Sequence, residues 1–151
     1  AAIAIHVLSV VWWIGGLAMV TTVLLPAFQR DFHPAPEVAL DYIERHFAPQ
    51  ARVAVILAGA SGFYMLGRLH AWSWFTTASY WWLDAMAAYW LLFVLILFVV
   101  EPLGRRASAG KRTGTSGSHK FRRMQRVHIV LLLLGLLVIG CGVIGSRGVS
   151  F

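Results

Sequence analysis

The chain has 151 residues, of which 59% are hydrophobic and 13% charged, and its mean hydropathy is +0.72. Such a chain has too little polar surface to cover a soluble globule, so we expect an integral membrane protein. Its single cysteine, Cys141, excludes an internal disulfide and a metal site built from several thiolates. The net charge of +7 is concentrated between apolar segments and no nucleic-acid-binding motif occurs, so nucleic acid is not an expected partner.

The first predicted membrane span covers Ala1 to Leu25, where His6 is the only ionisable side chain. At about 1.5 Å per residue, this segment is long enough to cross a hydrocarbon layer about 30 Å thick. Gly16 would let a neighbouring helix or a flat ring approach the backbone closely. Helical spacing places an ionisable and an aromatic side chain on one face, which holds His6, Val10, Trp13 and Leu17. The segment therefore predicts a buried ligand site.

A polar connection is predicted from Gln29 to Gln50. Its middle, from Glu37 to Phe47, has the pattern of a short amphipathic helix lying at the membrane surface. The second predicted span follows from Ala51 to Leu69, with Arg52 and Arg68 placed to reach opposite surfaces. Small residues within this span favour close helix packing.

The aromatic residues between His70 and Trp82 predict an interfacial loop or a short surface helix. The third predicted span runs from Trp81 to Val100 and is closed by Glu101 and Pro102, and the fourth runs from Val127 to Gly145. A basic loop, residues 103–126, joins them. The sequence thus predicts one all-α domain over residues 1–151, an integral membrane four-helix bundle with an interfacial amphipathic helix between its first two spans.

The distribution of basic residues predicts the orientation of the chain. With four spans, the first and third connections lie on the same side, and they contain most of the bases between the spans. The other side shows only Arg68 and Arg147. The positive-inside rule therefore places both polar connections in the cytoplasm and both termini in the periplasm of a bacterial inner membrane.

Four histidines at the ends of the predicted spans suggest ligands for haem iron. A b-type haem with two histidine ligands needs two imidazoles that face each other at one depth. His6 with His70 forms an outer candidate pair, and His46 with His128 forms an inner one. Basic residues near the inner pair, such as Arg52 and Arg126, are candidates to neutralise the haem propionates. The sequence therefore predicts one or two haem groups.

Each histidine also has a structural interpretation. An ionisable residue well inside a span is usually functional, which favours a ligand role for His6. For His128, just inside its span, a ligand and an interfacial residue are equally good interpretations. His46 and His70 lie at helix ends, where a histidine needs no special role.

The run His6-x5-Trp12-Trp13-Ile14-Gly15-Gly16, followed by Leu25–Pro26, resembles the first helix of the CopD-type copper-resistance membrane proteins and of the related HemJ-type membrane protoporphyrinogen oxidases. In the HemJ-like group the first-helix histidine is a haem ligand, which the resemblance carries to His6. Its partner there is a lysine in a Trp-Leu-His-x-Lys run that starts the third helix. Here Trp82-Leu83-Asp84-Ala85-Met86 stands in that place, so the Met86 thioether is the group that can ligate iron.

The sequence favours a membrane b-type haem protein that transfers electrons, to or from quinone or a partner redox subunit. It would be a membrane oxidoreductase or an electron-transfer subunit of one, embedded in lipid within a larger redox complex or a homo-oligomer. Copper transport is the alternative, although the four methionines form no close cluster of soft ligands. A non-catalytic small subunit of a respiratory complex is a third. The chain does not begin with methionine, and the sequence leaves open whether residues precede Ala1.

Overall fold

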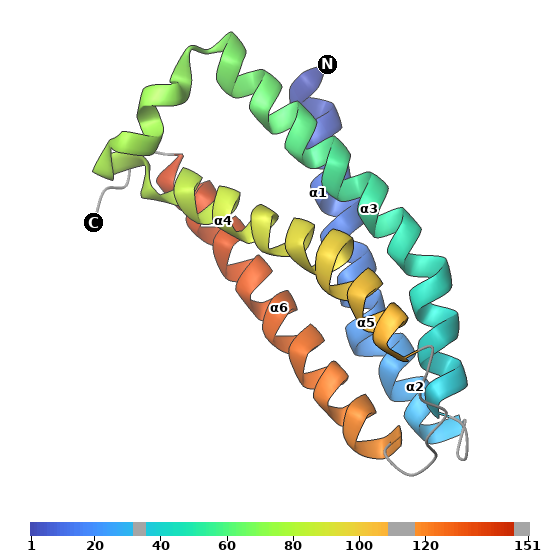
Figure 1. Cartoon of the computed structure of the whole chain (residues 1–151). Helices are drawn as coiled ribbons and strands as arrows, with labels where there is room; N and C mark the ends of the chain where they lie inside the picture. The colour runs from blue at the N-terminus through green and yellow to red at the C-terminus, as the bar shows by residue number, and fades with distance from the viewer. Residues whose placement is uncertain (32–35, 109–116, 147–151) are drawn as a thin grey trace.

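The structure, a computed structural model, describes residues 1–31, 36–108 and 117–146. Within these ranges all regular structure is helical, which confirms the prediction of an all-α chain. The α-helices follow one another in the order seen in Figure 1: α1 (Ala2–Met19), α2 (Leu25–Asp31), α3 (Pro36–Arg68), α4 (Trp81–Leu95), α5 (Glu101–Ser108) and α6 (Gly117–Gly145).

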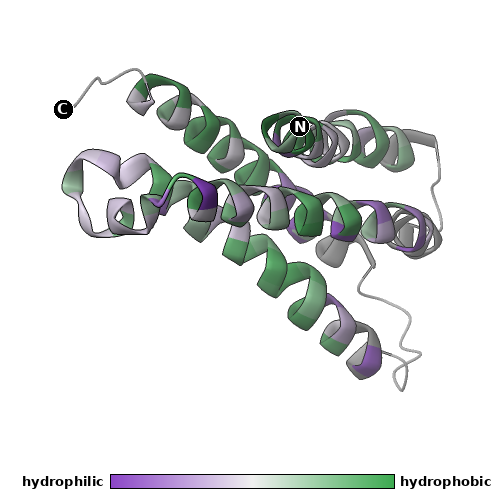
Figure 2. Cartoon of the chain, turned by 90° about the horizontal axis from the view of Figure 1, so that it is seen from above, coloured by the Kyte–Doolittle hydropathy of each residue, from purple (hydrophilic) through white to green (hydrophobic). Residues whose placement is uncertain are grey.

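Three helical stretches are long and apolar enough to cross a membrane, and they contain the first, third and fourth predicted spans. They are Ala2–Phe28, Ala78–Gly104 and Arg122–Gly145. Green, apolar positions run along most of α4 and α6 in Figure 2. The second predicted span lies in the second half of α3, which is not one of these three stretches.

The long helices lie side by side, with α1 packed most extensively on α3 and α4 on α6. Helices α2 and α5 finish at the same end of the molecule at which α3 and α6 begin (Figure 1), and we call this the α5 end. The start of α1 and the finish of α3 and α6 lie toward the opposite end, the α1 end. The first and third connections therefore share one end, as the sequence predicts.

Two short π-helical turns precede prolines, and the chain remains helical after each of them. One spans Val20–Leu24 before Pro26, and the other spans Ile96–Val100 before Pro102. A proline has no backbone N–H and its ring collides with the carbonyl four residues earlier, which bends or breaks a regular helix. A π turn widens the backbone at that point, so the chain passes the proline while remaining helical.

Helical structure therefore continues past the predicted ends of the first and third spans. The first span, expected to end near Pro26, continues as α2 to Asp31, and the third, expected to close at Glu101–Pro102, continues as α5 to Ser108. Helix α6 starts at Gly117, inside the predicted basic loop. Residues 109–116 and 32–35 of the two predicted connections lie outside the described residues. The arginines, lysine and glutamines assigned to these connections are good helix formers, which explains the longer helices.

The separate surface helix predicted from Glu37 to Phe47 is also wrong, because α3 is continuous from Pro36 to Arg68 and contains Pro49. Ala48, Gln50 and Ala51 around the proline favour helix. Pro49 is exposed.

The aromatic segment after α3 forms two short 3₁₀ helices, Ala71–Thr76 and Ala78–Tyr80, which confirms the predicted short helix. His70 lies in the turn between α3 and the first 3₁₀ helix, in the left-handed region with φ of 52°. Trp74 and Tyr80 stack with ring centroids 4.5 Å apart and join the two turns.

Aromatic side chains hold the centre of the molecule together. The Trp13 ring of α1 stacks on Tyr89 of α4 with centroids 5.6 Å apart and meets Phe93 edge-on at 4.7 Å. The Tyr89 hydroxyl donates to the carbonyl of Leu131 on α6 over 2.8 Å. These contacts join three helices around one buried cluster, and they fix the position of the Trp13 indole.

Candidate functional site

His6 is held between α1 and α3. Its Nδ1 lies 2.9 Å from the carbonyl oxygen of Ala58 and 3.3 Å from the Ser61 hydroxyl. A carbonyl oxygen only accepts, so Nδ1 carries the proton in this hydrogen bond. In the neutral ring, Nε2 is then left with a free lone pair. Histidines that bind metals are commonly oriented in this way by a backbone carbonyl.

Glycine at position 62 allows the ring to sit there. A Cβ atom added to Gly62 would lie 3.3 Å from Cε1 of His6, which is closer than most such contacts. The small residues predicted to favour close packing on this helix therefore serve in part to admit the imidazole.

The two predicted partners of His6 lie in different places. His70 is exposed, two residues beyond the end of α3 at Arg68, and it follows Ser61 by nine residues in the chain. Met86 is half-buried and packs on α6, where its methyl group occupies the space that a side chain at Gly142 would need.

A cavity of about 290 Å³ lies toward the α5 end and is lined by residues of α1, α3, α4 and α6. Both π turns contribute to its wall, through Val20 on one side and Ile96, Leu97 and Val100 on the other. Most of its lining is apolar. Widened helical turns of this kind are frequent at functional sites, and a cavity close to 300 Å³ is at the lower end of ligand pockets.

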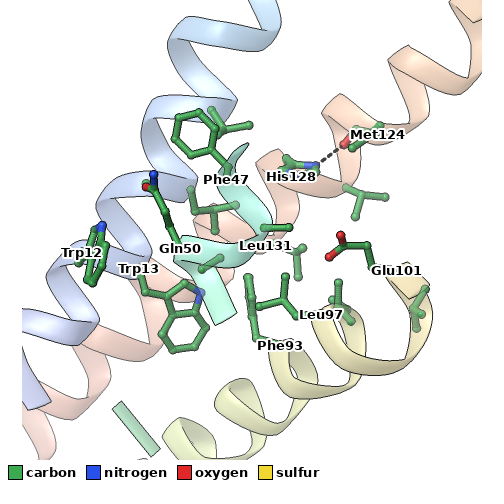
Figure 3. Close-up of a pocket in the computed structure, with 18 residues that line it drawn as sticks. Trp12, Trp13, Phe47, Gln50, Phe93, Leu97, Glu101, Met124, His128 and Leu131 are labelled. Atoms are coloured by element: carbon green, nitrogen blue, oxygen red, sulfur yellow. Dashed lines mark hydrogen bonds between the residues drawn. The ribbon is translucent and has the colours of Figure 1, made fainter. Parts of the chain in front are cut away.

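His128 stands in the wall of this cavity, as Figure 3 shows. Its Nδ1 bonds to the carbonyl oxygen of Met124, one turn earlier on α6, over 2.9 Å. By the same reasoning as for His6, Nδ1 is the donor and Nε2 is left to accept from a guest.

The predicted inner pair, His46 and His128, does not come together at this cavity. His46 is exposed, its Nδ1 bonds to the Tyr42 carbonyl over 2.8 Å, and its ring packs on that of Tyr42 with centroids 4.2 Å apart. Of the two predicted inner ligands, His128 alone lines the cavity.

The two arginines predicted to serve propionates also differ from each other. Arg52 pairs with Glu101 over 3.4 Å and donates from Nε to the carbonyl of Leu97 over 3.2 Å. It therefore joins α3 to the π turn that precedes Pro102. Arg126 is exposed on α6 and is the better placed of the two for an ionic partner outside the helices.

Trp13 also lines the cavity, and its indole N–H has no acceptor. The side chain is 6% exposed, and its Nε1 is one of two buried side-chain polar atoms without a hydrogen-bond partner in the described residues. The other is Nε1 of Trp82, which is outside the cavity lining. A buried donor left unpaired costs roughly 1–3 kcal/mol, so each needs an explanation.

The described residues contain no group of three or more histidine, cysteine, aspartate or glutamate side chains close enough to hold a metal ion. A haem iron takes only one or two ligands from the protein, so a haem site needs no such group.

Comparison with protein-family models, with curated proteins and with solved structures finds no match to this chain. The functions proposed below therefore rest on the residues and their geometry.

Sequence reasoning identified His6, Gly16 and the tryptophans next to them but missed the cavity. The usable signal was the pair of prolines, Pro26 and Pro102, at the same predicted depth inside apolar helices. Prolines placed there predict local widening of the helices, and a space between them follows from it.

Proposed function

We propose that the chain is a four-helix protein of the bacterial inner membrane that holds a b-type haem through His6 and transfers electrons. In this proposal the second half of α3 crosses the membrane together with the three apolar stretches, and the α5 end faces the cytoplasm. A resemblance of the His6 motif to the CopD-type and HemJ-type families supports the same assignment.

The observation that carries the proposal is the hydrogen bond from Nδ1 of His6 to the Ala58 carbonyl, 2.9 Å long. It fixes both the tautomer and the orientation of the ring, and it leaves Nε2 as a ligand for iron. An imidazole inside an apolar helix has few other reasons to be held in one orientation.

The residues present fit one axial ligand of a haem. The second must come from another group, and Met86 and His70 are the candidates. Met86 would have to turn away from Gly142 of α6, whereas His70 would have to fold back over the end of α3. A haem held by His6 alone would keep one axial position open. Haem iron alternates between its ferrous and ferric states and so supplies one-electron transfer.

An absorption spectrum of the detergent-purified protein tests the proposal. We expect a Soret band and an α band that sharpen on reduction, with haem that is extracted by acidic organic solvent, because the chain has no Cys-x-x-Cys-His attachment motif. A colourless protein that contains stoichiometric copper would instead support a copper transporter. A colourless, metal-free protein that co-purifies with larger subunits would support a structural subunit of a respiratory complex.

Reporter fusions test the proposed orientation. A fusion after Gly110 should report as cytoplasmic and a fusion at Phe151 as periplasmic, because the bases between the spans are concentrated on one side. Both fusion points lie outside the described residues. The reversed pattern would place the cavity and its two π turns near the periplasm.

A further inference from the structure

The cavity between the two π turns, which we call the π-turn cavity, contains a donor with no acceptor. Most of its lining is apolar or aromatic, with Gln50, Glu101 and His128 as the polar members, and its wall includes Trp13, whose Nε1–H is buried and unpaired among the described residues. Figure 3 shows the indole nitrogen on the side of Phe93 and Leu131, which also line the cavity. A guest that brings an acceptor completes a hydrogen bond that the described chain leaves unmade.

A water molecule is a poor guest for this space. An ordered water needs two to four polar partners, whereas the walls here are mostly hydrocarbon. The guest must therefore be largely apolar itself and carry an acceptor at its edge.

The shape of the wall favours a flat ring. Trp13 is clamped by Tyr89 and Phe93, and the Tyr89 hydroxyl is already used by the Leu131 carbonyl. Aromatic rings held in this way present fixed faces and edges on which another ring can pack. Gly16 adds a stretch of bare backbone to the same wall, and a Cβ placed on it would meet nothing within 4 Å.

The cavity also reaches the outer surface of the helices. Trp12 and Val100 both line it, yet they are 49% and 60% exposed. In the membrane placement proposed above, that surface faces lipid. A guest dissolved in the bilayer can therefore enter sideways.

We propose that the π-turn cavity binds the head group of a lipid-soluble quinone, with Trp13 Nε1–H donating to one carbonyl oxygen. The ring packs among the aromatic side chains and the prenyl tail leaves toward lipid past Trp12. The Trp13 nitrogen is buried, so a neighbouring side chain must move for the carbonyl to reach it. The assignment names the electron-carrying partner and, in that respect only, rests on the proposed function.

His128 extends the site to the reduced form of the guest. Because its Nδ1 donates to Met124, Nε2 can accept from the hydroxyl of a hydroquinone. The quinone has no hydroxyl to donate, so the hydroquinone gains one more hydrogen bond and should bind more tightly.

The test is a binding titration of the protein as purified, with whatever haem it carries, in nanodiscs with decylubiquinone. The affinity for the quinone is a readout separate from the haem spectrum. Trp13→Phe keeps a ring between Tyr89 and Phe93 but removes the donor. We expect its affinity to fall about threefold to tenfold, the effect of one net hydrogen bond. Trp82→Phe removes the other unpaired indole N–H, which is not in the cavity lining, and should bind as the wild type does.

A second pair of variants tests the location without removing any polar group. Gly16→Leu places a side chain in open space inside the cavity and should abolish binding. Gly15→Leu makes the same change at the adjacent position, which is exposed and outside the cavity lining, and should leave binding unchanged. Both substitutions favour the helix, so loss of folding is not expected.

Three outcomes would overturn the proposal. Equal affinity in Trp13→Phe and Trp82→Phe would mean that the N–H is not used, and equal affinity in Gly16→Leu and Gly15→Leu would place the guest elsewhere. Competition by 1-phenyldecane as strong as by the quinone itself would identify a lipid pocket. None of these results changes the haem spectrum on which the proposed function is tested.

Discussion

Replacing His6 with alanine should abolish the Soret band of the purified protein. The substitution removes an imidazole whose Nδ1 is held by the neighbouring helix α3, through the 2.9 Å hydrogen bond to Ala58, with Nε2 left to bind iron. Haem that is bound non-covalently depends on its axial ligands for retention, so we expect loss of haem and not only a shifted spectrum. The measurement is the haem-to-protein ratio after purification.

Matched variants separate ligation from structure. Ser61→Ala removes the weaker hydrogen-bond partner of His6 and should retain haem. His46→Ala removes an exposed imidazole outside the cavity and should also retain it. Imidazole added to His6→Ala should restore the spectrum by entering the space that the side chain leaves. A full complement of haem in His6→Ala would refute the site.

The opposite ligand is identified by the same measurement. If Met86→Ala converts the spectrum from low spin to high spin and His70→Ala does not, the thioether is the partner of His6, and the reverse result assigns His70. A change in neither variant would exclude both candidates as the second ligand.

Much of the fold follows from hydropathy alone. Apolar segments without charges, such as residues 1–25 and 127–145, have no stable alternative to long helices, and the structure contains them. The positions of the helix ends did not follow in the same way. In a sequence, Pro26 and Pro102 predict the ends of helices, yet a π turn before each proline allows the chain to continue as a helix. The choice between stopping and widening depends on the packing of neighbouring helices, which periodicity does not contain.

The sequence indicated which residues are candidates for the site but not how their side chains are oriented, because orientation depends on the packing of helices. The presence of a lone histidine in a span identified His6, but the direction of its ring depends on Ala58, far away in the sequence. Pairing by depth placed His46 with His128, whereas the rotation of α3 about its axis leaves His46 on the outer surface. The position of a residue in the sequence predicts its depth along a helix. Whether two imidazoles face each other also depends on how each helix is rotated about its axis and packed on its neighbours, which the sequence position does not give.

Gly59→Leu should destabilise the packing of α3 against α4 more than a substitution on the exposed surface does. Trp90 of α4 donates from Nε1 to the Val55 carbonyl of α3 over 2.9 Å, and its ring lies directly over Gly59. A Cβ at that position would overlap the ring, so the indole must move and the hydrogen bond must break. Overpacking of this kind costs about 1–3 kcal/mol, and a lost hydrogen bond adds about 1 kcal/mol.

The expected result for Gly59→Leu is a midpoint of thermal unfolding in detergent that is roughly 5–15 °C lower. Gly67→Leu is the control, since it lies on the same helix and a Cβ there meets nothing within 4 Å. It should unfold at or above the wild-type temperature, because leucine favours helix more than glycine does. Adding Trp90→Ala to Gly59→Leu opens space opposite the new side chain and should recover part of the loss. Equal midpoints for Gly59→Leu and Gly67→Leu would show that α3 and α4 do not meet at this glycine.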